Sequence, residues 1–264
     1  MPAHYAKKRF GQNFLHDAGV IERIIRSINP QPSDALIEIG PGLGALTAPL
    51  LKKLGRLRVI ELDRDVVPHL RKNCSDHPGL EIIMADALKV DYGALAPADV
   101  KLRIIGNLPY NISTPILFHL LNFSGHIHDM HFMLQKEVVD RMAAAPGDEA
   151  YGRLTVSLAA RTDVKKLFTV GPGAFQPAPK VDSAIVRLIP RPPSFEIADT
   201  ALFDRIVTAA FSQRRKTLAN GLKNMMNAKQ IEAAEIDPGI RAERLSAAEF
   251  ARLTAVAYRE LMNK

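Results

Sequence analysis

The chain has 264 residues, 47% of them hydrophobic, which is enough for one large domain or two smaller ones with packed cores. No apolar run approaches the roughly 20 residues of a membrane span, and the single cysteine, Cys74, excludes an intramolecular disulfide. We therefore expect a cytoplasmic protein without a membrane partner, with a short organellar presequence in the basic N-terminus as the alternative. The formal net charge of +7 favours a polyanionic partner such as nucleic acid over a basic protein that has none.

Short apolar strands alternate with helical segments in the first half of the chain. Strands are predicted over residues 35–39, 56–62, 80–86, 101–107 and 129–138. Helices are predicted over residues 45–54, 64–74, 114–123 and 138–145. This alternation predicts an α/β fold with a parallel sheet and helices on both faces, whose ligands bind beyond the carboxyl ends of the strands.

The second half changes character at a proline-rich linker. A helix is predicted over 153–161, followed by strands over 163–170 and 183–190 that are separated by the loop "GPGAFQPAPKVD". After "PRPPS" at 190–194 only helical patterns follow, over residues 202–226, 228–236 and 246–264. We therefore predict an α/β domain over residues 1–193 and a small helical domain over residues 194–264.

A glycine-rich stretch, "EIGPGLGALT", joins the first predicted strand to the following helix. Gly40 and Gly42 allow a tight turn and a close approach of the backbone to a cofactor. With Glu61 closing the next strand, the stretch also fits the loose dinucleotide fingerprint, so a nicotinamide-dependent dehydrogenase is a rival. A turn that only packs a helix on a strand is the non-functional alternative.

Acidic residues end three successive strands and favour S-adenosylmethionine over a dinucleotide. Glu38 is positioned to meet the amino group of the methionine part, Glu61 to accept from both ribose hydroxyls, and Asp86 to accept from the adenine amine. Buried acids at strand ends are costly unless they are paired, so three purely structural ones would be unexpected. Asp86, before "ALKV", is the one that could instead be a helix cap.

The segment "NLPY" at residues 107–110 closes the fourth strand beside the expected methyl donor. The Asn107 side-chain oxygen and the Leu108 carbonyl can each accept an N–H from a planar aromatic amine such as that of adenine. Pro109 stiffens the turn, and Tyr110 offers a face on which the base can stack. The alternative is a proline turn whose tyrosine packs into the core.

Six motifs together resemble one enzyme family. "QNFL", "EIGPGLGALT", "VIELD", "MADAL", "IGNLPYNIST" and "FQPAPKVDSA" occur in the order found in the rRNA adenine N6,N6-dimethyltransferases, and the chain is most similar to members acting on small-subunit rRNA. The resemblance covers about residues 8–220. It implies a Rossmann-like S-adenosylmethionine-dependent methyltransferase domain followed by a small all-helical C-terminal domain.

The resemblance also implies the substrate and the residues that bind it. The expected substrate is a pair of adjacent adenosines in a hairpin loop near the 3′ end of small-subunit rRNA, dimethylated during subunit assembly. Phe175 matches an aromatic residue that stacks on the flipped base, although the sequence alone allows a core anchor equally well. The cofactor contacts carry over to Asn13, Leu15, Gly40, Glu61, Asp86 and Asn107.

Two basic clusters are candidates for phosphate contacts, with an ordinary solvated surface as the alternative. They consist of Lys7, Lys8 and Arg9 before "QNFL", and of Arg214, Arg215 and Lys216 in "FSQRRKTL". The second cluster is expected to interrupt a helix. The histidines show no metal-like spacing with the cysteine, so no metal site is expected, and a monomer is assumed.

Two further functions stay open beside the small-subunit enzyme. One is a large-subunit rRNA adenine methyltransferase of the macrolide-resistance type, against which the "FQPAPKVDSA" loop argues. The other is a nucleic-acid-binding factor that keeps the fold without useful catalysis, against which the complete "NLPY" and the three acids argue.

Overall fold

The computed structural model of this chain describes residues 13–109, 112–213 and 215–263. The chain divides into two compact units. The sheet unit comprises the residues up to Val139 together with Lys165–Pro190, and the helical unit comprises Asp140–Val164 together with the residues from Arg191 onward. The predicted boundary at 193/194 lies close to Pro190, where the chain last passes from the sheet unit to the helical unit. Residues 140–164, which the prediction placed in the α/β domain of 1–193, group with the helical unit.

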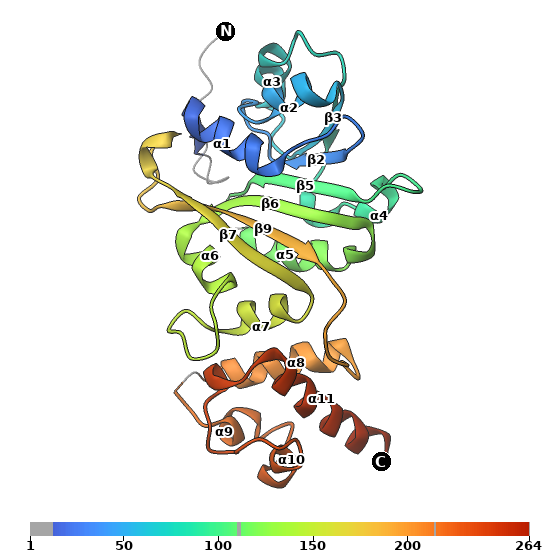
Figure 1. The fold of residues 1–264 in the computed structure, drawn as a ribbon, viewed down its shortest axis with the longest axis vertical. Helices are drawn as coiled ribbons and strands as arrows, with labels where there is room; N and C mark the ends of the chain where they lie inside the picture. Colours follow the sequence, from blue (N-terminus) through green and yellow to red (C-terminus); the bar gives the residue numbers. More distant parts are fainter. Residues whose placement is uncertain (1–12, 110–111, 214, 264) are drawn as a thin grey trace. The chain divides into compact units, whose positions relative to one another are not determined.

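A seven-stranded sheet forms the centre of the sheet unit, with the order β4-β3-β2-β5-β6-β9-β7 (Figure 1). The strands are β2 (Ala35–Ile39), β3 (Leu57–Glu61), β4 (Leu80–Met84), β5 (Leu102–Asn107), β6 (Ile127–Gln135), β7 (Thr162–Val170) and β9 (Ser183–Pro190). The first five in spatial order pair in parallel, as predicted, and β9 pairs with β6 in antiparallel fashion. The sheet is therefore mixed rather than wholly parallel, because β9 follows β7 through a loop without the crossover helix that a parallel neighbour requires.

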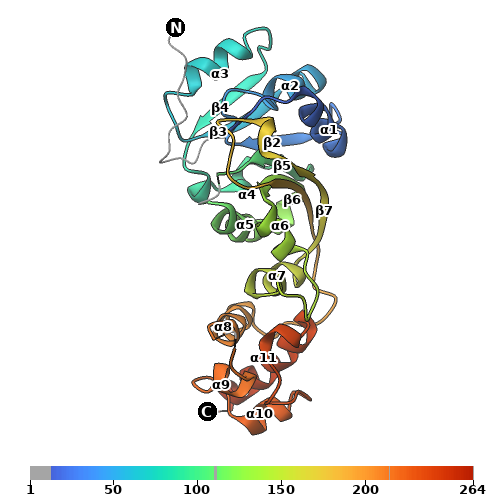
Figure 2. The ribbon, with the colours of Figure 1, turned by 90° about the vertical axis from the view of Figure 1, so that its left-hand side faces the viewer.

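Helices cover both faces of the sheet, as the alternation predicted. They are α1 (Ala18–Ile28), α2 (Thr47–Leu54), α3 (Val67–Asn73), α4 (Tyr92–Leu95), α5 (Ser113–Leu121) and α6 (Lys136–Met142). Side chains of α1, α2 and α3 form one buried cluster with sheet residues such as Val59 and Ile105. Figures 1 and 2 show α5 and α6 on the opposite side of the strands from α1 and α2.

Two elements near the N-terminus are absent from the sequence prediction. Helix α1 begins after Asp17, whose side chain accepts from the backbone N–H of Val20, and it ends at Asn29 in the left-handed conformation. Before it, the two-residue strand β1 (Phe14–Leu15) pairs in antiparallel fashion with β8 (Phe175–Gln176). Segments far apart in the sequence thus meet beside the sheet.

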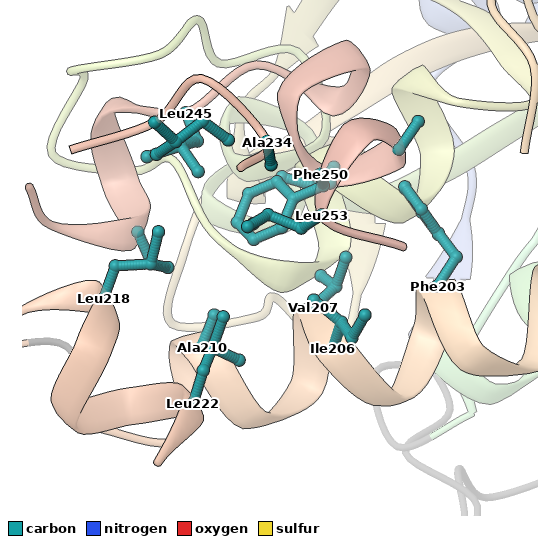
Figure 3. Close-up of a cluster of buried hydrophobic side chains, with 14 of the residues drawn as sticks. Phe203, Ile206, Val207, Ala210, Leu218, Leu222, Ala234, Leu245, Phe250 and Leu253 are labelled. Atoms are coloured by element: carbon teal, nitrogen blue, oxygen red, sulfur yellow. The ribbon is translucent and has the colours of Figure 1, made fainter. Parts of the chain in front are cut away.

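The helical unit has its own buried core, built around two long helices. Phe203, Ile206 and Val207 of α8 face Phe250 and Leu253 of α11, as Figure 3 shows. The helices are α7 (Arg153–Ala159), α8 (Thr200–Phe211), α9 (Leu218–Leu222), α10 (Ala228–Glu232) and α11 (Ala247–Met262). Residues of α7 belong to this core, which explains why 140–164 groups with the helical unit.

The helix predicted over 202–226 is in fact two helices with a turn between them. Helix α8 ends at Phe211, and α9 begins at Leu218. The backbone N–H groups of Leu218 and Ala219 donate to the carbonyls of Ile240 and Pro238, so this chain segment bonds to a distant loop instead of continuing α8. None of the helices in the described part of the chain is long and apolar enough to cross a membrane.

Candidate active site

A cavity of about 320 Å³ lies at the carboxyl ends of the central strands, where sheets of this type bind ligands. All its lining residues belong to the sheet unit. The predicted cofactor and catalytic residues that the structure describes all line it. These are Asn13, Leu15, Glu38, Gly40, Gly42, Glu61, Asp86, Asn107, Leu108, Pro109 and Phe175.

The glycine stretch after β2 forms one wall of this cavity. Gly40 and Gly42 adopt positive φ angles of 66° and 54°, which residues with a side chain rarely adopt. A Cβ atom on Gly42 would lie 3.3 Å from the ring of Phe14. The turn therefore keeps backbone, rather than side chains, against the cavity, as a closely bound cofactor requires.

Glu38 is the most deeply buried acid of the cavity, with 2% of its surface exposed. The Thr47 hydroxyl donates a 2.7 Å hydrogen bond to its Oε2. Burial raises the pKa of Glu38 to about 7; the Thr47 bond opposes this shift, and the charge of Glu61 adds to it. A cationic group bound in the cavity would stabilise the ionised carboxylate.

Glu61 and Asp86 follow in the order of the strands, at the ends of β3 and β4. Glu61 Oε1 accepts the backbone N–H groups of Leu62 and Asp63, both at 2.8 Å, and burial raises the pKa of Glu61. Asp86 Oδ1 accepts the Leu88 N–H at 3.0 Å and caps a short helix, so the capping role considered for Asp86 is confirmed. Since each carboxylate has further acceptor capacity, the capping bonds are compatible with cofactor binding.

Asn107 is the last residue of β5 and lies next to β2 in the sheet. Its Nδ2 donates a 3.1 Å hydrogen bond to the backbone oxygen of Asn13. Because a carbonyl only accepts, this bond assigns the NH₂ group to Asn13 and leaves the amide oxygen as the acceptor for another donor. The N-terminal segment thereby orients the side chain of Asn107.

The turn after Asn107 is held from two sides. The Leu108 N–H donates to the Met133 carbonyl at 3.2 Å, which ties the turn to β6. The Pro109 carbonyl accepts both the Ser113 hydroxyl, at 3.1 Å, and the Ile112 N–H, at 3.2 Å. The turn is thus braced against the sheet and against α5. Tyr110, the fourth residue of the predicted motif, lies outside the described residues.

Phe175 is only 3% exposed and belongs to the same buried cluster as Leu15, its partner in the β1–β8 pair. It also lines the cavity. The two interpretations offered by the sequence, core anchor and stacking surface, therefore do not exclude each other, because one face of a ring can pack while the other borders the cavity. Stacking on a base stays a prediction.

The basic clusters are described only in part. Lys7, Lys8, Arg9 and Arg214 lie outside the described residues. Arg215 and Lys216 are exposed and lie in the turn between α8 and α9, so this segment interrupts the helix predicted over 202–226. Among the described residues, no group of three His, Cys, Asp or Glu side chains is arranged to hold a metal ion.

The structure adds two residues that sequence reasoning missed, one that contacts a cavity acid and one that lines the cavity. Thr47, which bonds Glu38, is the last residue of the glycine-rich stretch and the first of α2, and its position there was the available signal. Ser183, the first residue of β9, lines the cavity from the far side of β6. Ser183 lies in the motif "FQPAPKVDSA", but its place in the cavity depends on the order of the strands.

The chain is similar to one family over almost its whole length. The family model described as "Ribosomal RNA adenine dimethylase" matches residues 3–258. A "Ribosomal RNA small subunit methyltransferase A" from Hahella chejuensis is 56% identical over 256 residues, which cover 97% of this chain and 94% of the relative. A protein of the same name from Nitrosococcus oceani is 54% identical over 253 residues, 95% of this chain and 96% of the relative.

Two solved structures share the fold of the chain. A dimethyladenosine transferase from Plasmodium falciparum has a TM-score of 0.76 at 28% identity, and covers 91% of this chain and 95% of its own. The 23S rRNA methyltransferase ErmE has a TM-score of 0.71 at 26% identity, and covers 93% of this chain and 100% of its own. These similarities confirm the predicted Rossmann-like methyltransferase fold with a helical C-terminal part.

Proposed function

The chain belongs to the ribosomal RNA adenine dimethylase family, and on that premise we propose that it methylates two adjacent adenosines in a 3′-terminal hairpin loop of small-subunit rRNA. The methyl donor is S-adenosylmethionine, and the product is N6,N6-dimethyladenosine. The high identity to relatives named as small-subunit methyltransferases favours this target over large-subunit rRNA. We further propose that the enzyme acts as a monomer, in the cytoplasm, on a partly assembled subunit.

The observation that carries this proposal is the fixed orientation of the Asn107 amide. Its Nδ2 is bonded to Asn13, so its oxygen is available to accept an N–H from the amine of adenine. The Leu108 carbonyl follows directly in a turn that β6 and α5 brace. Two acceptors at this position favour a pyramidal amine nitrogen, whose lone pair is then less delocalised into the ring.

The cavity has features that fit S-adenosylmethionine. Glu38 is a buried carboxyl group with a pKa of about 7, and the ammonium of the methionine part would stabilise its ionised form. Glu61 would accept from the ribose hydroxyls and Asp86 from the adenine amine, and both line the cavity near the ends of the neighbouring strands β3 and β4. When bound, this cofactor supplies an electrophilic methyl group on a sulfonium.

The residues of the chain contribute orientation and hydrogen bonding rather than strong base catalysis. Asn107 and Leu108 would hold the amine of the target adenine, and Phe175 together with Tyr110 would hold its ring. Methyl transfer forms an N–C bond as the S–C bond breaks, and the cationic nitrogen then loses a proton readily to water. Since the hydrogen bonds to the amine strengthen as charge develops on nitrogen, they stabilise the transition state more than the ground state.

RNA supplies a target base that is already accessible. A base in a hairpin loop leaves its stack at low cost, which suits a buried pocket. The basic clusters around Lys8 and Arg215 would contact phosphates, which adds affinity that depends little on sequence.

The test is methyl transfer from labelled S-adenosylmethionine to unmethylated small and large ribosomal subunits, with the modified nucleosides identified by mass spectrometry. We expect N6,N6-dimethyladenosine in small subunits alone. Label in large-subunit RNA would replace the proposed target by the resistance-type one, and transfer to neither would favour a binding factor without catalysis.

A variant of the orienting amide sharpens this test. Asn107→Ala should lower methyl transfer by about 100-fold or more, because one transition-state acceptor is lost, while S-adenosylhomocysteine binding measured by calorimetry changes little. The exposed Asn122, which ends α5, provides the matched control, and Asn122→Ala should leave transfer unchanged. Transfer by Asn107→Ala near the wild-type rate would refute the role of the amide.

A further inference from the structure

Ser183 is a buried polar residue of the cavity that no step above uses. It is 2% exposed and lines the cavity as the first residue of β9. The buried hydroxyls of Thr47 and Ser113 each donate to an oxygen of the protein, whereas Ser183 borders the cavity. A hydroxyl at the wall of a cavity can form a hydrogen bond with a polar group of a ligand bound there.

The sheet register places Ser183 on the same side as Asn107. Asn107 lies opposite Met133 of β6, and Met133 lies opposite Ile185 of β9, so these three side chains form one row on one face. Ser183 precedes Ile185 by two residues and therefore points to the same face. Its register partner is Gln135, which lies beyond Met133 in the direction of the carboxyl end of β5.

The strand order places the acids proposed to bind the cofactor and Ser183 on opposite sides of Asn107. Asp86, Glu61, Glu38 and Asn107 lie at or just beyond the carboxyl ends of β4, β3, β2 and β5, which are neighbours in that order. The three acids occupy the cofactor side. Ser183 follows beyond Asn107, with only β6 between β5 and β9. It therefore lies on the side of the target base.

We propose that the Ser183 hydroxyl donates a hydrogen bond to a ring nitrogen of the target adenine, at N1 or N7 beside the amine. This inference rests on the proposed function. Both hydrogens of the unmodified amine are taken by Asn107 and Leu108 in that proposal, so a further donor from the protein must meet a ring acceptor. The contact would select adenine and fix the rotation of the ring in the pocket.

The contact gains importance in the second methyl transfer. After the first transfer the amine retains one N–H and can satisfy only one of its two acceptors. The ring contact is unaffected by methylation. It is one of three hydrogen bonds to the base before the first transfer and one of two before the second. Loss of the hydroxyl should therefore slow the second transfer more than the first.

The first experiment compares wild type with Ser183→Ala on unmethylated small subunits. We expect kcat/KM for the first transfer to fall by about 3- to 10-fold, and N6-monomethyladenosine to accumulate, while S-adenosylhomocysteine affinity is unchanged. Ser157→Ala is the matched control: Ser157 is 1% exposed, lies in α7 and does not line the cavity. A product ratio in Ser183→Ala equal to that of wild type would overturn the proposal.

The second experiment changes the RNA and so does not depend on how the variant folds. Small subunits are reconstituted with rRNA whose target adenosines are replaced by 1-deaza- or 7-deazaadenosine. With one of these analogues, wild type should lose as much activity as Ser183→Ala loses on normal subunits. Ser183→Ala should lose no further activity with that analogue. Additive losses with both analogues would overturn the ring contact, whereas absence of transfer by wild type to normal subunits would refute the proposed function itself.

Discussion

Burial of Glu38 in the folded protein disfavours its ionised form, whereas the proposed binding of the cofactor ammonium favours that form. Its folded pKa of about 7 exceeds the ordinary value of 4.5, because burial disfavours the charged form. The folded protein thus binds more protons here than the unfolded chain between pH 4.5 and 7. The contribution of Glu38 to stability is full below this window, falls as the pH rises through it, and levels off above the folded pKa.

Replacing Glu38 by Gln should therefore stabilise the free protein at alkaline pH. Gln keeps an acceptor for the Thr47 hydroxyl but carries no charge. At about pH 8 we expect Glu38→Gln to raise the free energy of unfolding in urea by about 2–3 kcal/mol, with little difference at about pH 4.5. The variant should also bind S-adenosylmethionine more weakly at the alkaline pH. The exposed Glu260 gives the control, and Glu260→Gln should follow the wild-type pH profile.

Phe175 allows packing to be separated from stacking. Phe175→Leu retains an apolar side chain, so we expect a loss of about 1–2 kcal/mol in the free energy of unfolding. Methyl transfer should fall by about 10-fold or more, because a stacking face for the base is lost. The control is Phe203→Leu, at a fully buried position in the helical unit, which should show a similar loss of stability with unchanged transfer. Equal transfer by the two variants would leave Phe175 with a packing role alone.

Between elements, the closest approach at the site is that of β5 to β2. A Cβ atom on Gly106 would lie 2.6 Å from the Ile39 carbonyl oxygen, closer than such atoms come without a shift of the backbone. Gly106→Ala should push the two strands apart next to Gly40 and Asn107. We expect a loss of about 1–3 kcal/mol in the free energy of unfolding, together with weaker S-adenosylhomocysteine binding.

A glycine in open space provides the comparison for this prediction. A Cβ atom on Gly125, between α5 and β6, would meet no atom of the described residues within 4 Å, and the φ angle of Gly125 is not positive. Gly125→Ala should therefore be tolerated. If Gly106→Ala and Gly125→Ala had the same stability and the same affinity for S-adenosylhomocysteine, the close approach at Gly106 would not determine the geometry of the site.

The elements that the sequence predicted are those whose signal is local. Apolar runs such as 35–39 and 101–107 form strands, and the acids and glycines at their ends lie together because parallel strands share a carboxyl edge. Helix α1 also carried a signal, with Asp17 as its cap and Ile24, Ile25 and Ile28 on one face, and it was overlooked.

The elements that the sequence did not predict depend on distant partners. The pair β1–β8 has two residues in each strand, too few for a hydrophobic period to show. The sequence carries no proline or glycine at the end of α8. Helix α8 stops at Phe211, and the first two residues of α9, Leu218 and Ala219, bond to the carbonyls of Ile240 and Pro238. The place of Ser183 likewise requires the order β5-β6-β9, which no local pattern contains.

At the scale of the whole molecule, the effect of the net charge of +7 on RNA binding depends on which basic side chains are exposed. Arg215 and Lys216 are exposed in the turn between α8 and α9. If both contact phosphates, Arg215→Ala with Lys216→Ala should reduce the slope of log K against log salt by about 1.4–1.8. The exposed pair Lys52 and Lys53 in α2 is the matched control, and its double alanine variant should retain the wild-type slope. An unchanged slope in the first variant would identify an ordinary solvated surface.

The pairing of β1 with β8 has a consequence for the order in which the protein matures. Residues 13–15 and the glycine turn leave the ribosome early, but Phe175 and Ser183, which complete the cavity, are synthesised only after residues 140–164 of the other unit. A nascent chain that stops before 175 holds the three acids and Asn107 but lacks Phe175 and Ser183, which line the same cavity. On the proposed assignment of this cavity to the cofactor, we expect the donor to bind only after β8 and β9 have been synthesised, so an incomplete polypeptide should not compete with finished enzyme for the donor.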